Sequence, residues 1–224
     1  MRVRVIYEKR GGACFVPHVA LATLFSRAAR RAGIEISLTD GFSPHAKMSF
    51  GPELPAGVVA LHEPVDLWIK EEIAEEEKST RASAWTSSLN EQMPGGFRVR
   101  KCFFLPENAP SLGKDCRAAH YWIWTRNGNL TEKFLEHMKN HFGGDVLSAE
   151  DVNTEEYPGS RASIALAEPA KNGVGGWVRA GVATGLIAGW QDLCIVRTAL
   201  GRWSGAKVEP LEEARAATHE HGKP

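Results

Sequence analysis

The chain has 224 residues, of which 43% are hydrophobic and 24% are charged, so its composition is that of a globular protein and excludes a disordered one. Its formal net charge is zero, so bulk charge gives no argument for a particular partner. The four cysteines are Cys14, Cys102, Cys116 and Cys194. None belongs to a Cys-x-x-Cys pair, so we expect no structural zinc and no iron–sulfur cluster. We expect no other cofactor.

Two further absences in the sequence bear on location. No apolar run approaches the ~20 residues that span a bilayer, so we expect no membrane partner. Scattered thiols without a signal peptide fit a reducing compartment, and we expect the protein to be cytoplasmic.

Residues 1–105 alternate between strand and helix patterns. Alternating or short apolar runs predict strands at 2–8, 34–38, 65–70 and 97–105. Apolar residues at helical spacing predict a helix over 17–32, which ends at Gly33, and a second one that begins at Ser79 or Thr80. The order β-α-β-β-α-β is the ferredoxin-like arrangement.

Residues 106–118 have the composition of a linker, and residues 119–211 repeat the pattern less clearly. Strands are expected near 120–125, 145–152, 161–167 and 192–199, with a helix after the capping-box-like pair Asn129 and Glu132. Residues 212–224 form a polar tail. We therefore predict an α+β protein of two tandem ferredoxin-like lobes; one continuous α/β domain is the alternative.

Basic residues are concentrated near the amino terminus. Residues 1–51 contain eight Lys and Arg against three Asp and Glu, and three of the arginines lie on the predicted helix over 17–32. Arg27, Arg30 and Arg31 lie apart from the apolar stripe, so they could hold successive phosphates or simply face water.

The stretch 41–57 contains three prolines and three glycines, which predict a shaped loop. Phe42, His45 and Lys47 would offer a stacking ring, a hydrogen-bonding ring and a cation, the groups that hold single-stranded nucleic acid. The alternative is that Phe42 and Phe50 plug the core and that the polar groups face water.

Three segments resemble the radical SAM-linked protein family, a domain of unknown function found beside or fused to radical SAM proteins. They are Tyr7–Gly11, Arg30–Gly33 and the run Gly-Phe-Ser-Pro-His-Ala-Lys-Met-Ser-Phe-Gly over 41–51. The resemblance is specific over about residues 1–70 and diffuse beyond. It implies an accessory role in RNA or ribosome-related modification, with a radical SAM protein as partner.

Other chemistry-bearing residues favour structural roles. His18 leans toward the buried side of its helix, so we expect a half-buried imidazole more than an acid–base or ligand-binding one. His137 and His141 are spaced to chelate a metal but lack a third ligand, so no metal site is expected. Trp122 and Trp124 share a strand face and are expected in the core.

These observations favour a non-catalytic protein that binds RNA or a ribonucleoprotein beside a radical SAM enzyme. No carboxylate pair, Ser-His-Asp set or nucleotide-binding glycine motif points to a reaction. One alternative is a metal-independent RNA endonuclease with His18 or His45 as proton carrier. Another is a protein-interaction module in which the loop 41–57 docks on the partner. The expected binding residues are Arg27, Arg30, Arg31, Phe42, His45, Lys47 and His18.

Overall fold

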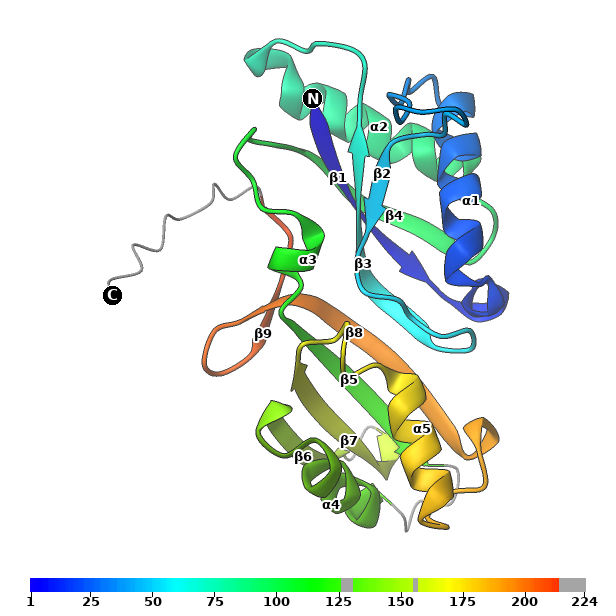
Figure 1. Ribbon diagram of the computed structural model, residues 1–224, viewed down its shortest axis with the longest axis vertical. Helices are drawn as coiled ribbons and strands as arrows, with labels where there is room; N and C mark the ends of the chain where they lie inside the picture. Colours follow the sequence, from blue (N-terminus) through cyan, green and yellow to red (C-terminus); the bar gives the residue numbers. More distant parts are fainter. Residues whose placement is uncertain (126–130, 155–156, 214–224) are drawn as a thin grey trace.

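A computed structural model describes residues 1–125, 131–154 and 157–213 and consists of strands and helices in the order shown in Figure 1. The first half contains β1 (Arg2–Lys9), α1 (His18–Arg31), β2 (Met48–Phe50), β3 (Val59–Trp68), α2 (Lys78–Gln92) and β4 (Phe97–Leu105). The second contains α3 (Leu112–Asp115), β5 (Ala118–Thr125), α4 (Thr131–Phe142), β6 (Val146–Thr154), β7 (Tyr157–Ala167), α5 (Val174–Ala183), β8 (Leu193–Trp203) and β9 (Val208–Pro210).

All the named strands belong to one mostly antiparallel sheet. Its main path runs β4-β1-β3-β8-β5-β7-β6, while β2 pairs with β3 and β9 pairs with β8. The two halves meet where β3 and β8 run parallel, through the pairs Val59 with Val196 and Ala60 with Arg197. The predicted α+β class is therefore confirmed, and the sheet is continuous across the two halves.

Each half has its own hydrophobic core between its helices and its strands. In the first half, Val5 and Tyr7 of β1 pack with Phe25 of α1 and with Trp85 and Leu89 of α2. In the second half, alternate residues of β5 pack with α4 and α5, including Tyr121, Ile123, Phe134, Met138 and Trp177. The helices of each half thus cover one face of its strands (Figure 1).

The prediction that Trp122 and Trp124 lie in this core is wrong. Their neighbours Tyr121 and Ile123 are buried, whereas both tryptophans remain partly exposed. Side chains alternate along a strand, so the tryptophans point to the face of β5 opposite the one that α4 and α5 cover.

Two buried ion-pair clusters join the halves, one on each face of the sheet. On the helix-covered face, Arg197 of β8 donates from Nε to Glu63 of β3 at 2.7 Å and from Nη2 to the carbonyl of Pro52 at 2.9 Å. On the opposite face, Arg4 of β1 donates to Asp66 at 2.7 Å and to Asp115 at 3.0 Å. Buried charges are tolerated only when they are paired in this way.

Two local predictions require correction. Residues 34–38 form isolated bridges, Ile36 with Ile69 and Leu38 with Ala46, because the segment changes partner too soon for a continuous strand. The second helix has no cap from Ser79 or Thr80: it begins at Lys78, directly after a 3-10 turn. Three glutamates in that turn, residues 75–77, complement the positive end of the helix dipole.

The predicted linker 106–118 connects the halves but is itself structured, since it contains α3 with Leu112 and Cys116 buried in the second core. The predicted pair Asn129 and Glu132 falls partly outside the described residues, as does most of the tail 212–224. Within the described part of the chain, no helix has the length and apolar character needed to cross a membrane.

Candidate nucleic-acid interface

Helix α1 is fixed at both its buried face and its carboxyl end. Leu21 and Phe25 lie in the first core. At the end of the helix, Gly33 has φ +73, and its N–H donates to the carbonyl of Arg30 at 3.2 Å. The N–H of the buried Ile34 donates to the carbonyl of Ala29 at 2.9 Å. This is a Schellman motif, and it turns the chain sharply from α1 into the segment that becomes the loop.

The outer face of α1 carries two arginines one helical turn apart. Arg27 and Arg30 are exposed, and no described carboxylate forms an ion pair with either of them. Thr23 and Ser26 lie on the same face, because residues three and four apart on a helix are neighbours. This face therefore presents two guanidinium groups and two hydroxyls to a ligand.

The loop after α1 is held by hydrogen bonds at its base. The N–H of Ser37 donates to the carbonyl of Trp68 at 2.7 Å, and the N–H of Lys47 donates to the carbonyl of Ser37 at 2.7 Å. Nearer the tip, the His45 N–H donates to Oγ1 of Thr39 at 3.2 Å. Nδ1 of His45 lies 3.1 Å from the same hydroxyl oxygen. The exposed imidazole is thus oriented by its own loop.

The two phenylalanines that flank this loop have opposite environments. Phe42, at the tip, is fully exposed to solvent. Phe50 is partly buried and lies edge-on to Phe25 with ring centroids 5.8 Å apart. Phe50 therefore plugs the core, whereas Phe42 does not, and the core-plug alternative is excluded for Phe42.

A groove lies between the outer face of α1 and this loop. It has a volume of about 750 Å³ and is lined by Ala22, Thr23, Ser26, Arg27, Arg30, Gly33, Ile34, Glu35, Ile36, Leu38, Pro44, His45, Ala46 and Lys70. Of its charged residues, Lys70 and Glu35 are exposed and lie 3.7 Å apart, so they offset one another. Arg27 and Arg30 give the groove its excess positive charge.

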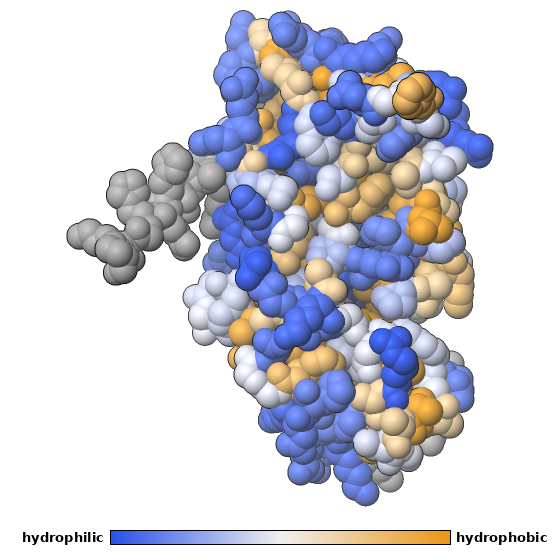
Figure 2. All heavy atoms as spheres, viewed as in Figure 1, coloured by the Kyte–Doolittle hydropathy of each residue, from blue (hydrophilic) through white to orange (hydrophobic). Residues whose placement is uncertain are grey.

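The surface around the groove also exposes apolar side chains. Leu38, which lines the groove, and Phe42, at the tip of the loop, are both exposed. Figure 2 shows orange atoms over α1 and the loop that follows it, bordered by hydrophilic blue. The interface thus combines cations with exposed apolar and aromatic groups.

Phe42, at the loop tip, does not line the groove itself, and three other predicted binding residues lie elsewhere. Arg31 turns toward α2 and donates to the Gln92 carbonyl at 2.7 Å, where it satisfies the carboxyl end of that helix. Lys47 lies over the Trp68 ring, with Nζ 5.6 Å from its centroid. Trp68 and Asp66 share the face of β3 that points away from α1. Lys47, which lies over Trp68, is therefore directed away from the groove.

His18 lies at the opposite end of α1 from the groove's arginines. Its ring is edge-on to Phe50 at 5.5 Å, and the side chain is half-buried, as predicted. Burial lowers the pKa of this imidazole, so it stays neutral at pH 7. His18 therefore supports the packing of Phe50 and does not reach the groove.

The sequence patterns predict neither of two residues that belong to the interface, Lys70 and Thr39. Lys70 reaches the groove because Ile69 bridges to Ile36, and Thr39 is needed to orient His45. Neither has a sequence signal, since both depend on pairings between distant segments. Among the described residues, no group of His, Cys, Asp and Glu comes together in a way that could hold a metal ion.

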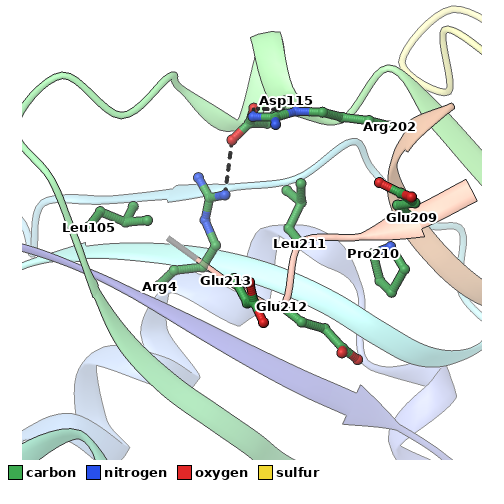
Figure 3. Close-up of a pocket in the computed structure, with 9 residues that line it drawn as sticks. All are labelled: Arg4, Leu105, Asp115, Arg202, Glu209, Pro210, Leu211, Glu212 and Glu213. Atoms are coloured by element: carbon green, nitrogen blue, oxygen red, sulfur yellow. Dashed lines mark hydrogen bonds and ion pairs between the residues drawn. The ribbon is translucent and has the colours of Figure 1, made fainter. Parts of the chain in front are cut away.

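A second pocket, of about 210 Å³, lies at the junction of the halves and is drawn in Figure 3. Asp115 lies between Arg4 and Arg202 and accepts from both. Both guanidinium groups are thus already neutralised, and three glutamates line the rest of the pocket: Glu209, Glu212 and Glu213. This pocket would repel an anion, so the groove on α1 is the better candidate site.

One family model and several solved structures show similarity to this chain. A family model described as "Uncharacterized protein conserved in bacteria (DUF2344)" matches residues 2–157. No curated protein matches the sequence significantly.

Solved structures with some similarity include three chains. An unknown protein from Galdieria sulphuraria has a TM-score of 0.24 and 11% identity, with 89% of this chain and 96% of that chain covered. The C. elegans NONO-1 homodimer has a TM-score of 0.22 and 16% identity, with 99% and 67% covered. The first two RRM domains of the yeast poly(U) binding protein Pub1 have a TM-score of 0.23 and 10% identity, with 89% and 99% covered. TM-scores this low support no inference about function.

Proposed function

The chain belongs to the DUF2344 family of uncharacterized proteins conserved in bacteria, and we propose that it is a non-catalytic accessory protein that binds single-stranded RNA or a ribonucleoprotein. The observation that carries this proposal is the groove beside α1. There Arg27 and Arg30 extend without a described acidic partner next to a loop that exposes Phe42 and orients His45.

The chemistry of these groups suits RNA. A guanidinium forms bidentate hydrogen bonds with a phosphate, and two of them one helical turn apart can engage the phosphates of one strand. An exposed aromatic ring on a braced loop offers a surface on which an unpaired base stacks. A base stacked on the fully exposed Phe42 ring would remove the apolar surface of that ring from water, which favours binding.

A radical SAM enzyme is the proposed protein partner. The support is the resemblance of residues 7–11, 30–33 and 41–51 to proteins linked with such enzymes. We also propose that the two halves are tandem ferredoxin-like lobes, since each contributes two strand–helix–strand passages. The strand orders β4-β1-β3-β2 and β8-β5-β7-β6, each counted within its own half, support this interpretation.

The test is a salt titration of RNA binding by the full chain. The variant R27Q/R30Q removes both groove cations and should reduce the slope of log affinity against log salt by about 1.4, at ~0.7 for each lost phosphate contact. The matched control is R31Q, which removes a neighbouring arginine that turns toward Gln92 and should leave the slope unchanged. Phe42→Ala should weaken binding by roughly 1–3 kcal/mol if a base stacks on the ring.

Melting temperatures measured alongside separate lost binding from lost folding. If R27Q/R30Q and R31Q change the slope equally, the groove is not the RNA site. If RNA does not bind at all but the chain retains a radical SAM protein in a pull-down that Phe42→Ala abolishes, the loop docks protein instead. Cleavage of labelled RNA by the wild-type chain would favour the endonuclease alternative.

A further inference from the structure

The second half presents an aromatic surface that the groove does not include. On β5, the side chains of Tyr121 and Ile123 enter the core, so those of His120, Trp122 and Trp124 share the other face. Strand β9 covers this face at the beginning of β5, where Val208 packs against Ala118 and Ala165. The two tryptophans lie beyond that cover and are partly exposed.

The rings and one arginine form a connected row. The Trp122 and Trp124 ring centroids are 6.3 Å apart with an interplanar angle of 79°. Cζ of Arg161, from the neighbouring strand β7, lies 4.9 Å from the Trp122 centroid and 6.0 Å from that of Trp124. One guanidinium thus contacts both rings, and cation–π attraction fixes the three groups relative to one another.

His120 extends the row and is itself held in place. Its ring lies 6.4 Å from that of Trp122, and its Nε2 is 2.8 Å from Oγ of Ser163. Its Nδ1 makes a short contact with Oγ1 of Thr198. Three adjacent strands, β7, β5 and β8, therefore hold this aromatic row in position.

The surroundings of the row indicate the kind of ligand. Directly across from the two tryptophans, β7 contributes Ser163 and Arg161, and β8 contributes Val196 and Cys194. Glu150 pairs with Ser163 and faces the same side, so it disfavours a phosphate there. Flat rings with one guanidinium and no excess positive charge suit the bases of a nucleic acid more than its backbone.

We propose that Trp122, Trp124 and Arg161 form a stacking platform for unpaired RNA bases, separate from the groove on α1. The ligand class is that of the proposed function, but the residues lie in the other half and on the opposite face of the sheet. Stacking releases few counterions, whereas phosphate contacts release many. An experiment can therefore refute the platform and leave the groove proposal standing, or the reverse.

The test uses a decameric oligouridylate and an RNA duplex of equal length, with the full chain. Trp124→Leu should weaken binding of the single strand about tenfold, as the loss of one stacked base does, and leave the salt slope unchanged. Trp124→Phe keeps a ring and should retain most of the affinity. Trp190→Leu changes an exposed tryptophan outside the platform and should have no effect. Duplex binding should not respond to any of these changes.

A second readout does not depend on the leucine variant folding. Oligouridylate should quench the tryptophan fluorescence of the wild-type chain, and the quenching should be lost in W122F/W124F but kept in Trp190→Phe. Unchanged quenching in W122F/W124F, or full affinity in a folded Trp124→Leu variant, would overturn the platform. Equal affinity of the leucine and phenylalanine variants would also overturn it, because an apolar docking face tolerates both. The salt slope of R27Q/R30Q reports on the groove alone.

Discussion

Removing the charge of Glu63 should destabilise the junction between the halves. Arg197 and Glu63 are both buried, with 1% and 7% of their side chains exposed, so solvent screens the pair little. Burial of Arg197 would disfavour its charge, but Glu63 and Tyr121 keep the pKa of the guanidinium above its ordinary value. In Glu63→Gln, a permanent buried cation would lose its counter-ion.

The expected magnitude follows from the remaining contacts. Losing one partner of a buried pair costs about 3–5 kcal/mol. Glutamine retains one acceptor oxygen and the Pro52 carbonyl still accepts from Arg197, so we expect the lower end, about 3 kcal/mol. For a chain of this size, that loss corresponds to a fall in melting temperature of about 6–12 °C.

Urea denaturation followed by circular dichroism measures this loss. The matched control is Glu35→Gln, which breaks the exposed Lys70 pair and should change stability by less than ~0.5 kcal/mol. Glu63→Leu combined with Arg197→Met should recover part of the stability, because no uncompensated charge remains. A loss below ~1 kcal/mol in Glu63→Gln, or no recovery in the double variant, would refute the reasoning.

Two further outcomes are expected. Phe50→Ala should cost about 2 kcal/mol by opening space beside Phe25, whereas Phe42→Ala should change stability by less than ~0.5 kcal/mol; equal urea midpoints for the two would contradict their assigned environments. Stability should fall as pH decreases from 7 to 5, because burial lowers the pKa of His62 and His120 and the unfolded chain therefore binds protons near pH 6.5 that the folded chain does not. Urea midpoints against pH should show this fall, and H62Q/H120Q should reduce it, leaving the smaller contribution of His18.

Local patterns were enough to predict the part of the site that depends on one helix. The apolar spacing located α1, and Gly33 marked its end because only that position needs a left-handed backbone. The three-residue spacing of Arg27 and Arg30 placed both on one face. Arg31 lies about 100° further round the helix, where its partner is the end of α2, and the sequence carries no signal for that contact.

The face of β5 could not be assigned from the sequence because both sets of alternating residues are apolar. Either set could line the core on the sequence pattern alone. In the structure the core contains Ala119, Tyr121 and Ile123, whereas Trp122 and Trp124 are partly exposed on the other face. On the helix-covered face, the fully buried Trp177 of α5 packs edge-on against Tyr121, with ring centroids 4.6 Å apart.

Photo-crosslinking of single-stranded RNA to the wild-type chain, followed by trypsin digestion and mass spectrometry, tests the central claim most directly. Cleavage after Arg31 and Lys47 releases residues 32–47, which contain Phe42 and His45, and cleavage after Arg117 and Arg126 releases residues 118–126 with both platform tryptophans. The proposed groove predicts RNA attached to the peptide 32–47, at a yield that falls as salt rises. RNA attached elsewhere in the chain, with the peptide 32–47 unmodified at low salt, would contradict it.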